Sequence, residues 1–242
     1  MSEVAPLAPA PGFLEAASGL GIEFEAGEVE RLGLYLALLL EANTSFNLTG
    51  ITDPAEAWTK HVLDSLTLLP LLADLPEGGR VADVGSGGGA PALPLAIVLP
   101  RARFTLIEAT GKKAAFLRET ARALGLTNVE VVCERAETLG QDRAGRREKY
   151  DAVTARALGH LAVAAELTVP LARPSGGRVL LVKGQRAEEE VAESAGALSR
   201  LHAGVAGVVP TPTGRVVVVE KRGATPRDYP RRPGEPKRSP LR

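Results

Sequence analysis

The sequence predicts an α/β fold, in which a helical N-terminal extension precedes a mostly parallel sheet that ends in an antiparallel hairpin. From residue 79 to residue 201, apolar segments of strand length alternate with segments of helical length. Such alternation is typical of a parallel sheet with helices on both faces. A glycine-rich loop at residues 85–89 follows the first strand. Only residues 210–214 separate the last two strands, too few for a parallel crossover.

The first 78 residues predict helices and turns. Residues 1–12 are rich in Ala and Pro and predict a flexible segment, whereas residues 13–78 predict a helical extension. Its first two helices, at residues 13–20 and 28–41, follow from the helical spacing of apolar residues. A third helix is expected from Asp53-Pro54 to residue 69, because Asp is a favourable N-cap and Pro fits the first helical position.

Residues 79–220 predict one cofactor-binding domain. The expected strands occupy residues 80–84, 103–107, 129–133, 150–154, 177–182, 203–209 and 215–220. The expected helices occupy residues 93–99, 112–124, 161–171 and 187–201. A charged connection at residues 141–149 joins the third strand to the fourth.

The last segment, residues 221–242, predicts a flexible basic tail. It contains eight Lys or Arg and two acidic residues, a net charge of +6, together with five prolines. A segment of this composition has too little apolar surface to build a core. Basic tails of this kind contact nucleic-acid phosphates, although a purely solubilising role would give the same composition.

The composition bounds the class of protein. With 242 residues, 45% of them hydrophobic, the chain can bury one sizeable core. It has no run of about 18 apolar residues that could span a membrane, no basic start of a secretion signal, and a single cysteine, Cys133. These features predict a cytoplasmic protein without a membrane partner, with Cys133 in the core. Scarce Asn, Gln, Met and Cys predict a thermophilic source, although a high-GC genome would also enrich Ala, Arg, Gly and Pro.

Asp83 decides which cofactor the glycine-rich loop suits. Gly85-x-Gly87 begins a dinucleotide fingerprint, with Ala90 as an allowed variant of its last glycine. A carboxylate two residues before Gly85 would repel a pyrophosphate, but it would attract the ammonium group of S-adenosylmethionine (SAM). A parallel sheet with a terminal antiparallel hairpin is also the class I SAM-dependent methyltransferase (Rossmann-like) arrangement. Both observations favour SAM as the cofactor.

The other candidate residues follow the carboxyl ends of the strands, where ligands bind in sheets of this kind. Glu108 follows the second strand and can accept hydrogen bonds from both ribose hydroxyls, and Ala136 and Glu137 follow the third strand, where the adenine would lie. Arg156 and Lys183 follow the fourth and fifth strands. The predicted cofactor site is Asp83, Gly85, Gly87, Ala90, Glu108, Ala109, Thr110, Ala136, Glu137 and Arg156.

These motifs resemble the RsmG (GidB) family, SAM-dependent guanine-N7 methyltransferases of small-subunit ribosomal RNA. The resemblance runs from about residue 35 to residue 220, in the family's order and spacing. One departure is that Ala90 and Ala92 replace the usual Leu or Ile and Gly. The resemblance implies 16S ribosomal RNA or the small ribosomal subunit as partner; we expect a monomer. Its motifs are Asn47-Leu48-Thr49, residues 61–65 (HVLDS), residues 83–87 (DVGSG), residues 106–108 (LIE) before Lys112-Lys113, Ala136-Glu137, residues 154–157 (TARA) and Lys183-Gly184.

The implied reaction needs alignment rather than a base, because guanine N7 carries a lone pair and no proton. We therefore expect Arg156 and Lys183 to be the catalytic residues through positioning: Lys183 at guanine O6 or a phosphate, and Arg156 on the cofactor side or at a phosphate. Asn47, His61 and Asp64 are expected to bind substrate, although His61 and Asp64 could simply pair along one helix. No metal site is predicted, because His61 has no companion His or Cys at ligand spacing.

Two other functions fit parts of the sequence. One is an NAD-dependent oxidoreductase on a similar sheet, against which Asp83 and the terminal hairpin argue. The other is a non-catalytic RNA-binding protein with a vestigial cofactor loop, against which the full set of polar strand ends argues.

Overall fold

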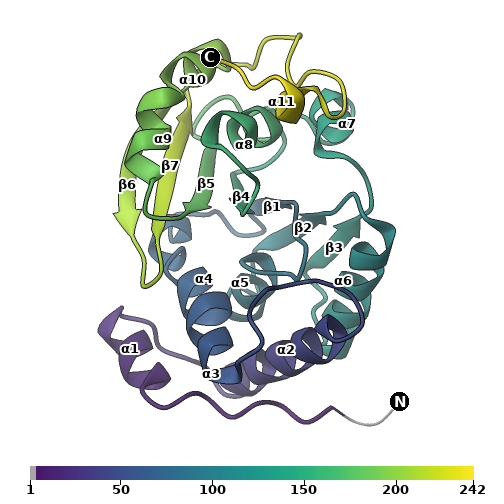
Figure 1. The fold of residues 1–242 in the computed structure, drawn as a ribbon, viewed down its shortest axis with the longest axis vertical. Helices are drawn as coiled ribbons and strands as arrows, with labels where there is room; N and C mark the ends of the chain where they lie inside the picture. Colours follow the sequence, from purple (N-terminus) through teal and green to yellow (C-terminus); the bar gives the residue numbers. More distant parts are fainter. Residues whose placement is uncertain (1–3) are drawn as a thin grey trace.

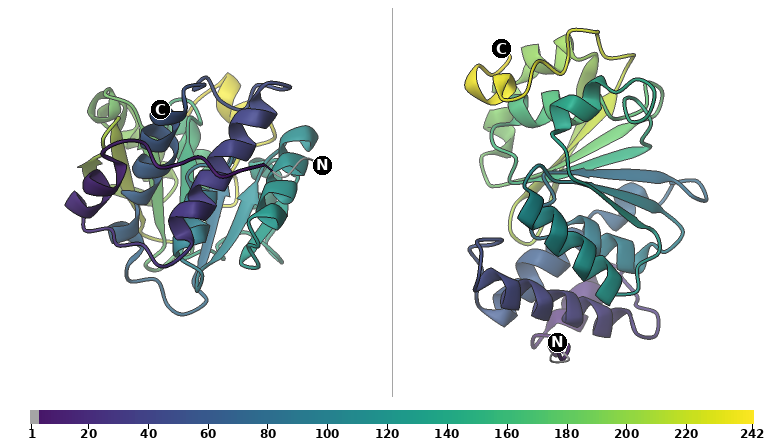
Figure 2. Two further views of the ribbon diagram at one scale, coloured as in Figure 1. Left: turned by 90° about the horizontal axis from the view of Figure 1, so that it is seen from below. Right: turned by 90° about the vertical axis from the view of Figure 1, so that its right-hand side faces the viewer.

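A seven-stranded sheet lies at the centre of the protein, between two layers of helices (Figures 1 and 2). The structure is a computed structural model that describes residues 4–242. The strand order is β3-β2-β1-β4-β5-β7-β6; β1 to β5 are parallel, whereas β7 is antiparallel to both of its neighbours. The expected fold class is confirmed.

The strands follow the expected segments closely, with shifts of one or two residues at some ends. Tyr150 makes only an isolated bridge to Ala172, so the fourth strand starts at Ala152. The strands are β1 (Arg80–Val84), β2 (Arg103–Ile107), β3 (Val129–Val132), β4 (Ala152–Arg156), β5 (Arg178–Lys183), β6 (Ala203–Pro210) and β7 (Arg215–Lys221).

The helices divide between the two faces of the sheet. One face carries the N-terminal helices with α5 and α6, and the other carries α7 to α11 (Figure 2). The bounds are α1 (Phe13–Gly19), α2 (Glu28–Asn43), α3 (Pro54–Ala57), η1 (Trp58–Leu63), α4 (Asp64–Leu66), η2 (Leu69–Leu72), α5 (Ala92–Val98), α6 (Gly111–Ala123), α7 (Ala136–Gln141), α8 (Leu161–Thr168), α9 (Ala187–Glu193), α10 (Ala195–Arg200) and α11 (Glu235–Arg238).

Side-chain alternation along the strands builds a separate core on each face. In β1, Val81 belongs to the core under the N-terminal helices, whereas Ala82 and Val84 belong to the core under α7, α8 and α10. All three side chains are at most 1% exposed. Successive strand residues point to opposite faces, so a strand buried on both faces is apolar throughout its length.

The third N-terminal helix is interrupted, although the sequence predicts one continuous helix. The chain passes from α3 into the π-helical turn η1, then α4 and the 3₁₀ turn η2. The Ser65 hydroxyl donates to the His61 carbonyl at 2.6 Å, and the Thr67 hydroxyl donates to the Asp64 carbonyl at 2.6 Å. Such side chains compete with the backbone ladder, and Pro70 lacks the N–H that a longer helix needs.

Three further expectations differ from the structure. The helix expected at residues 187–201 is two helices, α9 and α10, with the buried Ser194 between them. A short helix, α7, starts at Ala136, in a stretch for which no helix was expected. Cys133 is exposed rather than in the core, because β3 is an edge strand that ends one residue earlier.

The N-terminal segment packs against the helical layer. The Leu7 N–H donates to the Gly33 carbonyl at 3.2 Å. A Cβ on Gly33 would lie 2.2 Å from the Leu7 carbonyl oxygen, so the contact requires glycine at that position of α2. The expected flexible segment therefore contains residues that make defined contacts; its residues 1–3 lie outside the described residues.

The C-terminal segment also differs from the expectation of a flexible tail. Residues 222–242 cross the layer that contains α7 and α8, and α11 lies beside both helices (Figure 1). The buried Arg147 guanidinium donates to the carbonyls of Gly140, Thr225, Pro226 and Tyr229 at 2.6–3.1 Å. These hydrogen bonds satisfy backbone groups without a large apolar surface, so hydrophobic composition did not reveal the packing.

Arg231 anchors the same segment through a buried ion pair with α8. Its guanidinium donates to both carboxylate oxygens of Glu166, at 2.6 and 2.8 Å. The Glu166 side chain is fully buried. Removing one partner would leave a buried charge without its counterion.

We predict that Arg231→Ala lowers the free energy of unfolding by about 3 kcal/mol. Arg101→Ala is the control, because the Arg101–Glu77 pair is exposed at 82% and 77% and its loss costs less than about 1 kcal/mol. Urea unfolding of the two variants measures both changes. Equal midpoints would contradict a stabilising role for the Arg231 pair.

Candidate active site

A cavity of about 940 Å³ opens at the carboxyl ends of β1, β2 and β4. Parallel register sets this position, because Val84 at the end of β1 lies beside Ile107 of β2 and Ala155 of β4. Five predicted cofactor residues line the cavity: Gly85, Glu108, Ala109, Ala136 and Glu137. The other predicted cofactor residues, Asp83, Gly87, Ala90, Thr110 and Arg156, lie outside this lining.

Glu108 joins the two loops that border the cavity. One carboxylate oxygen accepts the Gly87 N–H at 3.0 Å, and the other accepts the Thr110 N–H at 2.8 Å. Each carboxylate oxygen has a second lone pair, so both oxygens can still accept hydroxyl donors from a ligand. The side chain is only 7% exposed, which fixes its orientation toward the loops. Gly87 and Thr110 therefore shape the site without lining it.

The helical extension contacts the glycine-rich loop and stabilises it. The buried Tyr35 hydroxyl in α2 donates to the Gly88 carbonyl at 3.1 Å, and burial raises the pKa of Tyr35. Gly85 and Gly89 have φ values of +71° and +99°, which other residues adopt only with strain. A Cβ on Gly89 would lie 2.5 Å from Leu93 Cδ1. Tight packing therefore adds to the backbone requirement for glycine.

Asp83 is a buried carboxylate with an unused oxygen. Its Oδ1 accepts the Thr154 hydroxyl at 2.7 Å, whereas its Oδ2 is buried without a hydrogen-bond partner among the described residues. Burial raises the pKa of Asp83 to about 6. Such an arrangement is costly unless a donor or cation completes it, and the ammonium group of SAM would supply both. The residues present thus fit SAM.

Arg156 is held by the helical extension. Its guanidinium donates to the Lys60 carbonyl and to His61 Nδ1, both at 2.7 Å. Burial and the neighbouring Arg156 lower the pKa of His61 to about 3, so its imidazole is neutral. With Nδ1 as the acceptor, Nε2 carries the hydrogen and donates to the Thr49 hydroxyl at 2.9 Å. His61 thus contacts Arg156 rather than Asp64.

Asp64 links the helical extension to the β6–β7 turn. Its carboxylate accepts the Thr213 N–H at 3.2 Å and the Thr213 hydroxyl. Burial raises the pKa of Asp64. The two acceptor contacts identify a structural link, and the predicted substrate role of Asp64 remains a proposal.

Lys183 and Asn47 lie in different environments. The Lys183 ammonium contacts Glu190 Oε2 at 2.6 Å and donates to the Gly159 carbonyl at 2.5 Å. Gly159 lines the cavity, so Lys183 lies next to it while bound to α9. Asn47 is exposed in the connection after α2. The sequence predicted both as substrate residues, and the structure keeps Lys183 close to the cofactor cavity.

Among the lining residues that were not predicted from the sequence, two groups come from separate parts of the chain. The β4–α8 turn contributes Leu158, Gly159 and His160. The turn after β4 was a recognisable ligand position, and only Arg156 was selected from it. The C-terminal segment contributes Gly234, Pro236, Lys237, Arg238 and Pro240. The sequence gives no signal for this placement, because the contacts join residues far apart in the chain.

The family assignment agrees with this geometry. A sequence model described as "GidB: rRNA small subunit methyltransferase G" matches residues 28–212. The chain belongs to the rRNA small subunit methyltransferase G family. It is 56% identical over 228 residues to the ribosomal RNA small subunit methyltransferase G of Sorangium cellulosum, covering 94% of each chain. It is 39% identical to the protein of the same name from Leuconostoc citreum, covering 95% of this chain and 98% of that protein.

Solved structures agree with the fold. A SAM-dependent methyltransferase from Aquifex aeolicus superposes with a TM-score of 0.54 at 18% identity, covering 74% of this chain and 97% of that one. A Corynebacterium glutamicum protein gives the same TM-score at 17% identity, covering 86% of this chain and 95% of that one.

Within residues 4–242, no helix has the length and apolarity to cross a bilayer, and no three His, Cys, Asp or Glu side chains gather as metal ligands.

We predict that SAM affinity falls as the pH drops through about 6. A protonated Asp83 must lose its proton before it can pair with a cation, so Kd should rise by up to about tenfold per pH unit below 6. Calorimetric titration at pH 7.5 and pH 5 measures this change. Asp83→Asn, which cannot ionise, should bind SAM more weakly and with little dependence on pH. The same Kd at both pH values in the unaltered protein would contradict the role of Asp83.

Proposed function

We propose that this protein transfers the methyl group of SAM to N7 of a guanine in 16S ribosomal RNA. The observation that carries the proposal is a pair of buried carboxylates in a chain of the methyltransferase G family: Glu108, which follows β2 and lines the cavity, and Asp83, which lies in β1 two residues before the cavity-lining Gly85. Small-subunit ribosomal RNA is the substrate named for the relatives, and N7 is the atom that the family resemblance implies.

The cofactor site orients SAM through its two ends. Asp83 would pair with the ammonium group, and Glu108 would accept the ribose hydroxyls while it holds the loops at Gly87 and Thr110. Ala136 and Glu137, which line the cavity, would border the adenine. When bound, SAM supplies an electrophilic methyl group on a sulfonium. Binding it at both ends fixes the direction in which that methyl group points.

The acceptor needs no general base, and the site is consistent with this. Guanine N7 attacks through its lone pair and has no proton to lose. His61, the buried imidazole of the helical extension, is neutral, and both ring nitrogens already have partners, Arg156 and Thr49. Its role is to orient Arg156. Burial raises the pKa of Asp83 to about 6, and the positive charge of Arg156 offsets part of that rise. Arg156 therefore acts on the cofactor side or at an RNA phosphate.

Lys183 is the candidate for contact with the RNA. Its ammonium lies beside the cavity-lining Gly159, and Glu190 offsets its charge. A cation placed directly on N7 would oppose the reaction, because N7 becomes positive as it accepts the methyl group. Guanine O6 and the phosphates are acceptors that Lys can bind without this penalty. Asn47 is an exposed candidate for the same substrate.

Two alternative functions have no support from the relatives, which carry the methyltransferase name. An NAD-dependent oxidoreductase would place a pyrophosphate next to the buried Asp83, at an electrostatic cost. A non-catalytic RNA-binding protein would not need a cavity lined by Gly85, Glu108 and Glu137. We further propose that the enzyme is cytoplasmic and acts as a monomer. Light scattering of the purified protein tests the monomeric state.

Mapping of methylated nucleotides tests the reaction. Small-subunit ribosomal RNA incubated with the protein and labelled SAM should gain one N7-methylguanosine. Gly85→Val should abolish both SAM binding and methyl transfer, because Gly85 lines the cavity and a Cβ there would lie 2.9 Å from Leu158 Cδ1. Methylation at another atom, or of another RNA, would contradict the proposal.

Gly125→Val is the matched control for Gly85→Val. Gly125 has φ +66°, close to the +71° of Gly85, and a Cβ there would meet no atom within 4 Å. Both variants therefore carry similar backbone strain. If Gly125→Val loses SAM binding as Gly85→Val does, the loss reports strain rather than the cavity.

We predict that Lys183→Ala retains SAM affinity and lowers methyl transfer at least about tenfold, the equivalent of one charged hydrogen bond. Glu190→Gln separates this role from a structural one, because it removes the partner of Lys183 and keeps the ammonium. It should retain methyl transfer if Lys183 contacts RNA. Equal losses of transfer in both variants would identify Lys183–Glu190 as a structural pair.

A further inference from the structure

The C-terminal segment reaches the cofactor cavity, although the family model matches only residues 28–212. Gly234, Pro236, Lys237, Arg238 and Pro240 line the cavity that Gly85 and Glu108 border. These residues are about 150 positions away from the glycine-rich loop in the sequence. In Figure 1 this segment, in yellow, passes between α8 and α7, the helix that starts at Ala136.

A direct hydrogen bond joins this segment to a predicted cofactor residue. The Gly234 N–H donates to Glu137 Oε1 at 2.8 Å. The Glu137 side chain is 7% exposed, so the bond closes one side of the cavity at the start of α7. Gly234 has φ +82°, which a residue without a Cβ adopts readily. The turn at Gly234 directs the following residues, α11, along the cavity.

Several anchors hold the segment in this position. Before Gly234, Arg147 binds the carbonyls of Thr225, Pro226 and Tyr229, and Arg231 pairs with Glu166. After α11, Leu241 is 7% exposed and belongs to the core under α8 and α10. The stretch at the cavity is therefore fixed at both ends. Lys237 and Arg238 between them are exposed.

We infer that residues 234–240 form a wall of the SAM site, so that the C-terminal segment is a cofactor-binding element of this protein. The inference rests on the cofactor site proposed above. A wall that borders the adenosine end excludes water from that end and adds contact area to the ligand. Because binding linkage is reciprocal, SAM should in turn hold the segment more tightly against α7 and α8.

Truncation after Gly234 tests the wall by ligand affinity. This variant keeps the Arg147 contacts, the Arg231–Glu166 pair and the Gly234 N–H, and it lacks residues 235–242. Calorimetry should show the Kd for SAM rising about tenfold, the equivalent of about 1.4 kcal/mol. Circular dichroism reports whether the truncated chain is folded. A folded truncated chain with an unchanged Kd would overturn the inference.

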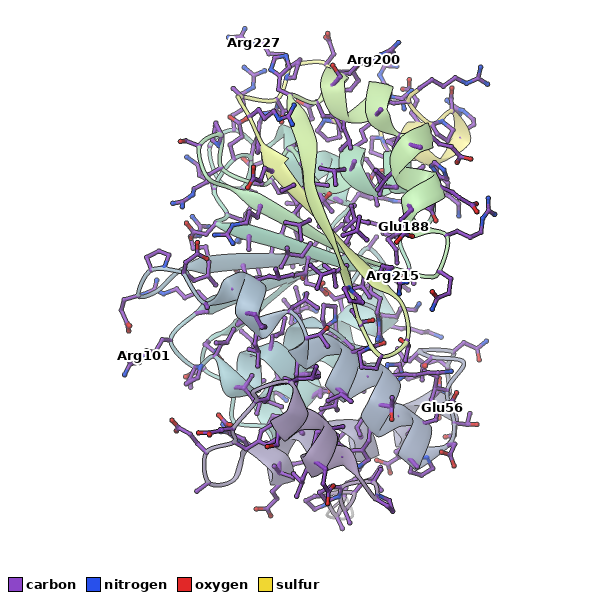
Figure 3. The ribbon with its side chains drawn as sticks, turned by 90° about the vertical axis from the view of Figure 1, so that its left-hand side faces the viewer. Glu56, Arg101, Glu188, Arg200, Arg215 and Arg227 are labelled. Atoms are coloured by element: carbon purple, nitrogen blue, oxygen red, sulfur yellow. The ribbon has the colours of Figure 1, made fainter. Side chains whose placement is uncertain are left out.

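Hydrogen exchange in the full chain tests the same inference without any loss of stability. The amides of Gly234, Arg238 and Ser239 donate within the wall or to Glu137. Saturating SAM should slow their exchange about tenfold or more, as expected for linked binding. The turn around Arg101 is the internal control, because Figure 3 shows Arg101 far from the end of the molecule that carries Arg200 and Arg227. Equal slowing at both places, or none at the wall, would overturn the inference.

A matched pair of double variants separates the wall from a charge effect. Lys237→Ala with Arg238→Ala removes two cations at the cavity, and Arg227→Ala with Arg232→Ala removes two cations elsewhere in the segment. Only the first pair should change the Kd for SAM. Gly85→Val separates a wrong cofactor site from a wrong wall. If Gly85→Val binds SAM normally, the proposed cofactor site is wrong. If Gly85→Val loses SAM binding while the truncated chain keeps an unchanged Kd, only the wall is rejected.

Discussion

The parallel register of β1 with β2 and β4 is the constraint on which the site depends. It places Asp83, Glu108 and the β4–α8 turn at one edge of the sheet, although β1 and β4 are some 70 residues apart in sequence. Each strand end then needs a polar partner, because its backbone leaves the ladder there. Glu108 supplies two such partners by accepting the Gly87 and Thr110 N–H groups. The same carboxylate thus stabilises the loops and faces the cavity.

The helical extension works as a support for this edge rather than as a separate module. Tyr35 holds the Gly88 carbonyl, His61 holds Arg156, and Asp64 holds the β6–β7 turn at Thr213. Tyr35, His61 and Asp64 are each buried and make polar contacts, so the geometry of these contacts is specific. The C-terminal segment supports the opposite side through Arg147 and Arg231. The cavity therefore lies between two supports that come from the two ends of the chain.

Burial of charge is tolerated at this site because nearly every polar atom has a partner. Glu166 has Arg231, Lys183 has Glu190, and Asp83 Oδ1 has Thr154. Asp83 Oδ2 is buried without a hydrogen-bond partner among the described residues. An unpaired buried carboxylate oxygen is costly in a protein without its ligand. Pairing with a cationic ligand would offset that cost. Because the other charged groups named here already have partners, Asp83 is the residue at which we propose that a cation binds.

The sequence alone determined the sheet, its terminal hairpin and the residues at the strand ends, because strand–helix alternation and glycine placement are local signals. It also predicted Asp83 and Glu108 as cofactor residues, from their positions near the end of β1 and directly after β2. Tertiary structure decided the partner of His61, the roles of Tyr35 and Thr213, and the path of residues 222–242. Those contacts join residues distant in the chain through single hydrogen bonds and ion pairs. Such contacts leave no periodic pattern in the sequence, and only the packed fold brings their partners together.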